Sequence, residues 1–208
     1  MTRGATDRPN AAQIVGPASI VHDLPPHPTA RPATLLRVTA RFELSTERLH
    51  LRRLGAEHLD ELVELDSDPA VMRFITGGEP TPRQTYIDDL LPRMTAFEEK
   101  PYGFAAAYEN DAFVGWFHLR PSVADASVLE IGYRLRQAAW GRGLATEGSR
   151  ALITYAFDTL DRSVVDACAL PENAASIAVM KKCGMTYAGR LTHPRAHVEV
   201  VRYWLQRP

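Results

Sequence analysis

The sequence predicts an α+β domain with one hydrophobic core. Hydrophobic residues make up 45% of the 208-residue chain, which is enough for a sizeable core in a single domain. After residue 40, runs with the two-residue period of strands follow or precede runs with the 3.6-residue period of helices. We therefore expect residues 41–208 to fold as one domain.

The first forty residues differ in composition from the rest. Prolines interrupt any helix or strand ladder in this segment, at Pro9, Pro17, Pro25, Pro26, Pro28 and Pro32. We interpret residues 1–40 as a disordered or loosely attached extension, although the composition also fits a segment that lies in a groove.

A strand and a helix open the domain. Apolar residues alternate at Leu49 and Leu51, and this two-residue period predicts a strand. A stripe of apolar side chains with helical spacing predicts a helix over residues 56–65. Pro69 follows shortly after, and the residue before a proline avoids the helical conformation, so the helix should end there.

Short segments separate this helix from the next one. Residues 71–75 are expected to form a single helical turn, and the glycines and prolines of residues 77–82 predict a loop. A second apolar stripe predicts a helix over residues 83–98, in which Pro92 should cause a kink or an interruption.

A hairpin and a third strand are predicted in the middle of the domain. Residues 102–109 and 112–119 are strand-like, and Asn110-Asp111 between them has the composition of a tight hairpin turn. The next strand, at residues 128–135, should place Leu129, Ile131, Tyr133 and Leu135 on its apolar face and Glu130, Gly132 and Arg134 on the other.

Helices and strands alternate in the last third of the chain. A helix is expected over residues 144–158, a buried strand over 163–170 and a final strand over 198–205. Between the last two strands, Asn173 can cap a helix, Ile177 and Met180 can face inward, and Gly184 can end it.

A turn containing two glycines joins the strand at residues 128–135 to the following helix. It reads Trp140-Gly141-Arg142-Gly143-Leu144-Ala145-Thr146-Glu147. N–H groups at a helix start point outward, the helix dipole favours negative charge there, and glycine lets a phosphate approach the backbone. The turn therefore predicts an anion site, although an ordinary tight turn with Trp140 packed beside it also fits.

Two common nucleotide motifs do not fit this turn. A P-loop requires Gly-x-x-x-x-Gly-Lys-Ser/Thr, and this string is absent from the sequence. A dinucleotide fingerprint requires Gly or Ala where the turn has Thr146, and it belongs in the first strand–helix unit of a chain. A nucleotide-binding module is therefore disfavoured.

The turn and the capped helix together resemble the GNAT acetyltransferase superfamily. The turn is similar to its pyrophosphate loop, Gln/Arg-x-x-Gly-x-Gly/Ala, with Trp140 in place of Gln or Arg. The helix is similar to its Asn-x-x-Ser/Ala…Lys-x-Gly-Phe segment, with matches at Asn173, Ser176, Lys182 and Gly184, while Met185 replaces Phe. The opening segment, Leu44-Ser45-Thr46-Glu47-Arg48-Leu49-His50-Leu51-Arg52, looks like the start of RimJ/RimL-type domains.

This resemblance covers about residues 43–205 and implies a fold and a donor substrate. The fold is a mixed, twisted central sheet with helices on both faces, in which the strands at 128–135 and 163–170 splay apart to hold acyl-CoA. The donor is acetyl-CoA, no metal is needed, and the acceptor is an amine of a protein N-terminus or a small molecule. The residues implied to bind acetyl-CoA are Ile131, Gly132, Tyr133, Trp140, Gly141, Arg142, Gly143, Leu144, Ala145, Thr146, Asn173, Ser176 and Lys182.

Acetyl transfer to an amine requires a neutral amine, a donor for the tetrahedral oxyanion and an acid for the departing thiolate. The resemblance implies that Glu130 is the base, directly or through water, and that Ser176 is the acid. A salt-bridged glutamate and a serine bonded to its own helix backbone are the alternatives. Many members of the superfamily place a tyrosine acid four residues after this serine, where this chain has Met180.

Other candidate groups carry less weight. His118, and His197 with Glu199, are alternative acid–base residues. Cys168 and Cys183 are expected to be apolar fillers, and no cluster of His, Cys, Asp or Glu has metal-ligand spacing.

Composition limits the partners. The net charge of −1 gives no general attraction to nucleic acid or to an anionic membrane, and no apolar run approaches the ~18 residues of a membrane span. Two cysteines make no disulfide framework, and the start of the chain lacks a secretory apolar region. We expect a cytoplasmic monomer or homodimer; a non-catalytic acyl-CoA-binding or regulatory domain is the alternative function.

Overall fold

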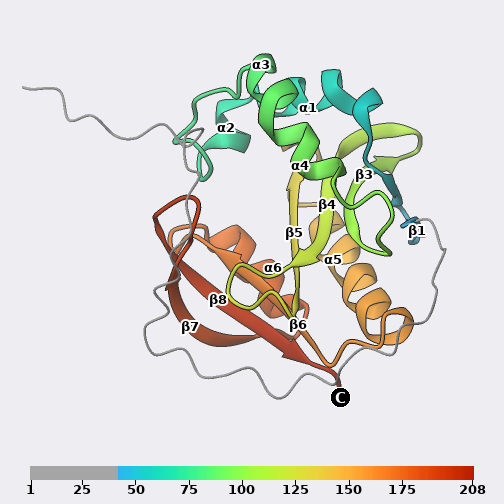
Figure 1. Ribbon diagram of the computed structural model, residues 1–208, viewed down its shortest axis with the longest axis vertical. Helices are drawn as coiled ribbons and strands as arrows, with labels where there is room; N and C mark the ends of the chain where they lie inside the picture. Colours follow the sequence, from blue (N-terminus) through green and yellow to red (C-terminus); the bar gives the residue numbers. More distant parts are fainter. Residues whose placement is uncertain (1–41) are drawn as a thin grey trace, which may run out of the picture.

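The computed structural model describes residues 42–208, so the predicted extension at residues 1–40 lies outside the described residues and stays a prediction. The described part forms an eight-stranded mixed sheet with helices on both faces (Figure 1). The sheet order is β1-β2-β3-β4-β5-β6-β8-β7. The strands are β1 (Leu44–Ser45), β2 (His50–Arg53), β3 (Gly103–Glu109), β4 (Ala112–Pro121), β5 (Leu129–Leu135), β6 (Val164–Ala169), β7 (Thr186–Thr192) and β8 (Glu199–Gln206).

The helices agree with the predicted ones in place and differ in their ends. They are η1 (Ala56–His58), α1 (Leu59–Leu65), α2 (Pro69–Met72), α3 (Arg83–Thr85), η2 (Tyr86–Leu90), α4 (Leu91–Thr95), η3 (Gln137–Ala139), α5 (Leu144–Thr154), η4 (Tyr155–Thr159) and α6 (Ala174–Lys182). The turn expected at residues 71–75 is α2, which begins earlier because Asp68 caps it through the Ala70 N–H at 2.8 Å. None of the helices from Phe42 onward is long and apolar enough to cross a membrane.

The helix expected over residues 83–98 is continuous from α3 to α4 and ends at Thr95. The α-helical pattern is interrupted near Pro92, as expected. The π-helical turn η2 precedes the proline, and the Leu91 N–H donates to the Tyr86 carbonyl five residues back. Because Pro92 then lies in the first turn of α4, its missing N–H disrupts no established α-helical ladder.

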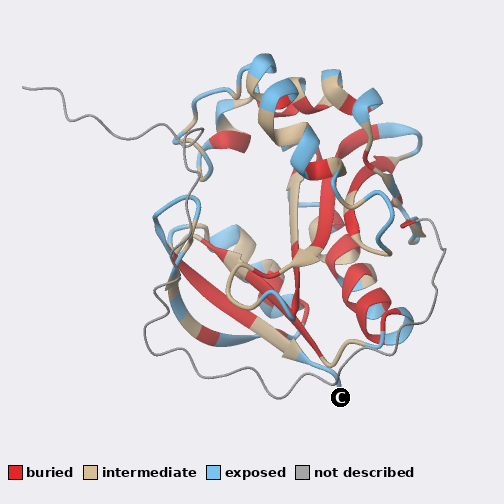
Figure 2. Cartoon of the chain, viewed as in Figure 1, coloured by how far each residue is buried: buried red, intermediate tan, exposed pale blue. Residues whose placement is uncertain are grey.

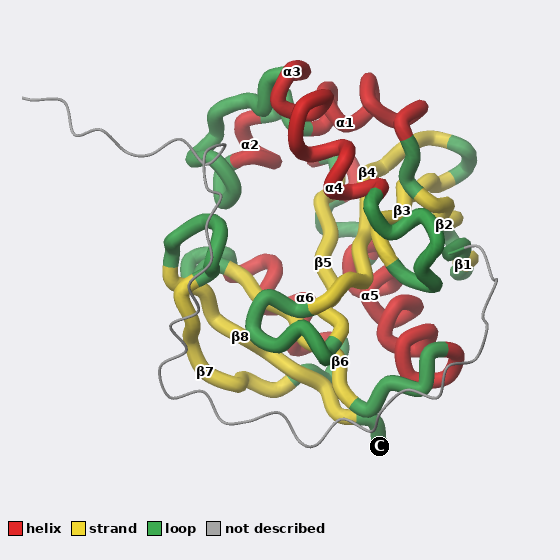
Figure 3. The backbone as a smooth tube through the Cα atoms, viewed as in Figure 1, coloured by secondary structure: helices red, strands yellow, loops and turns green. Residues whose placement is uncertain are grey.

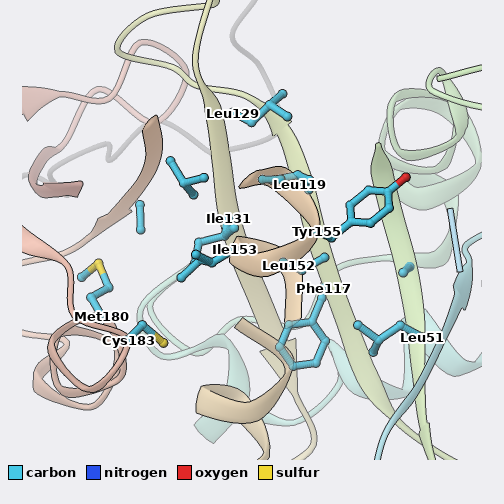
Figure 4. Close-up of a cluster of buried hydrophobic side chains, with 14 of the residues drawn as sticks. Leu51, Phe117, Leu119, Leu129, Ile131, Leu152, Ile153, Tyr155, Met180 and Cys183 are labelled. Carbon is cyan, nitrogen blue, oxygen red and sulfur yellow. The ribbon is translucent and has the colours of Figure 1, made fainter. Parts of the chain in front are cut away.

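Successive residues of the central strands face two different hydrophobic clusters. Ala105 and Phe117 belong to the larger cluster, which α5 and α6 cover, whereas Ala106 and Trp116 belong to the smaller one, which α1–α4 cover. Figure 2 shows the central strands and the inner sides of these helices buried. Figure 4 shows the larger cluster, in which Ile131 of β5 lies beside Ile153 of α5.

The hairpin of β3 and β4 has the predicted turn. Asn110 and Asp111 have positive φ angles of 49° and 64°. Asparagine and aspartate tolerate this conformation better than other non-glycine residues, and it is the conformation that a tight two-residue hairpin requires. The turn therefore sets the pairing of β3 with β4 at the hairpin end, and β4 in turn pairs with β5.

β5 and β6 form the parallel pair of the described sheet, and they pair at only two positions. Leu129 lies opposite Val165, and Glu130 lies opposite Asp166. Beyond this point β5 pairs with β4 as far as Leu135, and β6 pairs with β8. The sheet therefore parts after Glu130 and Asp166, as the splayed strand pair predicts, and in Figure 3 β5 and β8 run in clearly different directions.

A buried carboxylate joins the α1–α4 layer to β5. Asp66, at the end of α1, has no exposed surface and accepts hydrogen bonds from Tyr86 (2.7 Å), Thr81 (3.0 Å) and Arg134 of β5 (2.6 Å). Burial first, and then the nearby Asp66 charge, raise the pKa of Tyr86 far above its usual value, so that this phenol stays a donor. These contacts hold the helices of this layer over the face of β5 that carries Glu130.

Candidate active site

The turn before α5 requires glycine at two positions. Gly141 and Gly143 have left-handed φ angles of 71° and 84°, and Gly143 is the N-cap of α5. A Cβ at Gly141 would meet nothing within 4 Å, so the space beside it is open. The first helical hydrogen bond runs from the Glu147 N–H to the Gly143 carbonyl, which leaves the N–H groups of residues 144–146 without a carbonyl inside the helix.

Side chains of the opening segment hold this turn in place. Glu147 accepts hydrogen bonds from Thr46 (2.5 Å) and from the Arg48 side chain (2.7 Å) and backbone N–H (2.9 Å). Arg48 also donates to the Arg142 carbonyl at 2.8 Å. Partial burial alone would raise the pKa of Glu147, but the hydrogen bonds from Thr46 and Arg48 outweigh it and lower that pKa.

Other side chains of the turn point away from an anion site. The Arg142 guanidinium makes two hydrogen bonds of 2.7 Å to Glu109 at the end of β3. The Trp140 indole N–H donates to the Leu135 carbonyl at 2.8 Å, although the ring is largely exposed. Leu144 is fully buried in the core. The side chains of Trp140, Arg142 and Leu144 are thus each engaged by other parts of the described chain.

Helix α6 runs between the two ends of the predicted site. Asn173 caps its start by accepting from the Ser176 N–H at 3.1 Å, and Gly184, with φ of 81°, follows its end, both as predicted. At that end the Cys183 thiol lies 3.8 Å from the Thr146 carbonyl in the first turn of α5. Lys182 precedes this contact, so the structure brings it to the same end of the molecule as the glycine turn.

The start of α6 contacts β5 through two hydroxyl groups. Tyr133 Oη lies 3.5 Å from Ser176 Oγ. The contact joins β5 to α6 on the side of the sheet where the strands have already parted, because Tyr133 comes three residues after Glu130. Ile131, on the same face of β5, is part of the hydrophobic core. Ser176 is therefore close to β5, where the prediction for both residues requires it.

Glu130 lies on the opposite face of β5, buried and paired. Its Oε1 accepts from Arg120 at 2.8 Å and lies 3.5 Å from His118 Nε2, whereas its Oε2 and both His118 nitrogens have no hydrogen-bond partner among the described residues. The His118 ring lies over Gly132, since a Cβ there would be 2.6 Å from it. Glu130 is thus salt-bridged to Arg120 in this structure, and its role as a base stays a prediction.

The surroundings fix the charges of this pair. Burial alone would raise the pKa of Glu130, but the contacts with His118 and Arg120 lower it below its ordinary value. Burial first, and then Arg120, lower the pKa of His118 to about 4. At neutral pH a glutamate carboxylate thus lies beside a neutral imidazole.

Asp166 is a buried carboxylate that sequence reasoning missed. It lies opposite Glu130 on β6 and accepts from Ser122 at 2.7 Å and from Arg202 at 3.1 Å. Burial raises its pKa to about 6, against the opposing effect of Ser122 and Arg202. The roles of Arg48 and Arg120 were also missed. The one sequence signal for Arg48 was the opening segment, because it contains both Thr46 and Arg48, the two residues that donate to Glu147.

The alternative acid–base candidates lie elsewhere. His197 is exposed in the turn before β8, and Glu199 pairs with Arg190 on the surface. Cys183 is buried in the core and Cys168 is half-buried, and burial raises the pKa of both thiols. Between residues 42 and 208, no group of three or more His, Cys, Asp or Glu side chains is placed to hold a metal ion.

Comparisons with known proteins agree with this geometry. An Acetyltransferase (GNAT) domain matches residues 48–186. The FsC-acetyl coenzyme A-N(2)-transacetylase of Aspergillus fumigatus is 32% identical over 160 residues, which are 73% of this chain and 68% of the relative.

Two solved structures show the same fold. A GNAT-family acetyltransferase from Bacillus anthracis has a TM-score of 0.63 at 21% identity, over 79% of this chain and 98% of that one. RimL, a ribosomal L7/L12 alpha-N-protein acetyltransferase, has a TM-score of 0.63 at 18% identity, over 77% and 95%. Because the domain match spans more than half of the sequence, the chain belongs to the GNAT acetyltransferases, enzymes that use acetyl-CoA.

Proposed function

We propose that this enzyme transfers the acetyl group of acetyl-CoA directly to a primary amine, with both substrates bound at once. The main support is the position of Glu130 on β5. The gap between β5 and β6 begins at a buried carboxylate, Glu130, and β5 leads from there to the glycine turn before α5. Acetyl-CoA fits this arrangement, with its pyrophosphate at the glycine turn and its thioester near Glu130.

The chain offers suitable groups to the donor substrate. Past Glu130, β5 keeps register partners on its β4 side, so the backbone of residues 131–133 has an edge available to bind the pantetheine arm as an added strand would. The N–H groups of residues 144–146 and the open space at Gly141 suit the pyrophosphate. Asn173 and Lys182 lie at the two ends of α6, whose start contacts Tyr133 through Ser176 and whose end contacts Thr146 through Cys183.

The amine side is assigned to Glu130. Its free Oε2 is a buried acceptor without a partner among residues 42–208, and such an atom costs about 1–3 kcal/mol unless it gains one. An acceptor N–H, or a water that contacts it, supplies that partner. Because the carboxylate is ionised at neutral pH, it can take up the amine proton directly or pass it to water.

A primary amine is the acceptor class, and the relatives support no narrower one. The Aspergillus relative is named for an N(2) position and RimL for a protein alpha-nitrogen. Both names specify acetyl transfer to a nitrogen, but they name different acceptor molecules.

A panel of amines tests the proposal. Amino acids, short peptides, aminoglycosides and polyamines are offered with acetyl-CoA, free thiol is measured, and products are identified by mass spectrometry. We expect acetylated amine and thiol in equal amounts for at least one class. Tight acetyl-CoA binding with no turnover on any amine or on a cell extract would favour the non-catalytic alternative instead.

A further inference from the structure

Two hydroxyl groups meet across the place where the sheet parts. Tyr133 comes from β5 and Ser176 from the first turn of α6, and their oxygens are 3.5 Å apart. The Asn173 cap fixes the backbone of Ser176, and the Phe117 ring packs against Tyr133 with centroids 5.8 Å apart. The backbone of Ser176 and the ring of Tyr133 are therefore held in place by their surroundings.

Thioester cleavage is helped by a hydrogen-bond donor close to the departing sulfur. When the carbon–sulfur bond breaks, sulfur keeps the electron pair and leaves as a thiolate, whose parent thiol has a pKa of roughly 8.5. Glu130 lies on the other face of the strand and is ionised, so it cannot donate there. Met180, one turn further along α6, has no donor group and is packed in the core.

We infer that the Tyr133 hydroxyl, with Ser176 beside it, donates the hydrogen bond that stabilises the departing thiolate of coenzyme A. This assignment rests on the proposed function. No proton needs to reach the sulfur inside the site: the phenol stays neutral, the thiolate leaves stabilised, and it is protonated from solvent after release. The amine proton leaves separately through Glu130.

The environment of Tyr133 keeps it a donor at every working pH. Burial raises the pKa of its phenol above the usual value, and the contact with Ser176 opposes this only in part. Cys183 is the other titratable group that acts on it, also in the raising direction. A phenol with a raised pKa is a poor proton source and a lasting hydrogen-bond donor, which is the role assigned here.

Bound coenzyme A gives a first test of the assignment that needs no amine, and turnover with an accepted amine gives a second. Coenzyme A carrying ¹³C at the carbon next to sulfur is titrated by NMR in complex with each variant. In the parent complex we expect the thiol pKa about one unit below its free value of ~8.5. Tyr133→Phe should return it toward the free value and lower kcat by ~10²-fold, with coenzyme A affinity unchanged by calorimetry. Tyr155→Phe, which removes a hydroxyl bonded to the Pro101 carbonyl elsewhere, should change neither.

The outcomes separate this inference from the proposed function. No binding of coenzyme A to the parent would overturn both. Binding with a thiol pKa that is the same in the parent and in Tyr133→Phe would overturn the role of Tyr133 and leave the acetyltransferase standing. If Ser176→Ala alone raises the bound thiol pKa, the serine is the donor and the assignment of Tyr133 is wrong.

Discussion

Glu130 and Asp166 lie opposite each other as the last register pair before β5 and β6 part. Both are buried, yet their surroundings move their pKa values in opposite directions. Contacts with His118 and Arg120 lower that of Glu130, whereas burial raises that of Asp166 to about 6. Two neighbouring carboxyls with separated pKa values can have different tasks, and Glu130, whose Oε2 has no hydrogen-bond partner among residues 42–208, is the one proposed to act on the amine.

The first prediction concerns the amine side. Glu130→Gln should lower kcat/KM by ~10²–10⁴-fold with acetyl-CoA affinity unchanged, because the variant cannot accept a proton. Because contacts with His118 and Arg120 lower the pKa of Glu130, the parent should lose activity through this group only at a pH below the ordinary titration range of a glutamate. Kinetics across pH on an amine accepted in the panel measure both effects. Glu199→Gln is the control; if it is the variant that loses activity, the base is on β8.

The second prediction concerns the glycine turn. Gly141→Ala should weaken acetyl-CoA binding about tenfold or more, since a side chain would occupy the open space beside the turn. Gly77→Ala is a matched control, because Gly77 also has a positive φ, 79°, and a Cβ added there would likewise meet nothing within 4 Å. Both variants should lose similar stability. Equal affinity for acetyl-CoA in calorimetry would rule out the turn as the anion site.

A third prediction separates capping from binding at Asn173. Its Oδ1 accepts from the Ser176 N–H, so its amide N–H groups remain to bind a cofactor. Asn173→Ala should cost about 1 kcal/mol of unfolding free energy, whereas Asn173→Asp keeps the cap and should stay near the parent. Both should weaken acetyl-CoA binding. Parental affinity in Asn173→Asp would mean that the residue is a helix cap only.

The fourth prediction is a pair of opposing pH effects. The pKa of Asp166 is about 6 when folded and ~3.9 when unfolded, so the folded state binds more protons in between and stability falls as pH rises through that window. The pKa of His118 is about 4 when folded and ~6.5 when unfolded, so its contribution rises with pH over nearly the same window. The two effects oppose each other in the parent.

Single substitutions should expose each effect. Between about pH 4 and about pH 6, the unfolding free energy of Asp166→Asn should rise more steeply than that of the parent, and that of His118→Gln less steeply. Urea denaturation at the two pH values measures the slopes. The comparison uses slopes because Asp166→Asn also lowers stability at every pH by weakening the Arg202 pair. Three identical slopes would contradict both pKa shifts.

Local patterns in the sequence predicted much of this fold. Some residues act through their own backbone or through a residue within a few positions, as do Asn110-Asp111, Asn173 and Gly184. The local residue types were therefore sufficient to predict the hairpin turn and the two ends of α6. β7 was not predicted, because Ala188 is its one fully buried residue and a bulge near Gly189 breaks its register, which leaves no two-residue period. Edge strands with a polar outer face carry little periodic signal.

The sequence predicted only those parts of the candidate site that depend on backbone conformation. The glycine turn was found because φ angles restrict residue type at each position. The contacts that hold it were not found, because Arg48 and Glu147 are 99 positions apart and no local pattern pairs them. The same holds for Asp166 and Arg202, and for the meeting of Tyr133 with Ser176.

The buried Asp66 has a consequence for how the surface of the α1–α4 layer could diverge during evolution. Thr81, Tyr86 and Arg134 all donate to it, and these residues lie outside the segment 74–79. That segment contains Gly77 and Gly78 and exposes Ile75, and its surface is free to accept substitutions and insertions without disturbing the anchor. A lineage could therefore vary residues 74–79 while the contacts that join the α1–α4 layer to β5 are inherited unchanged.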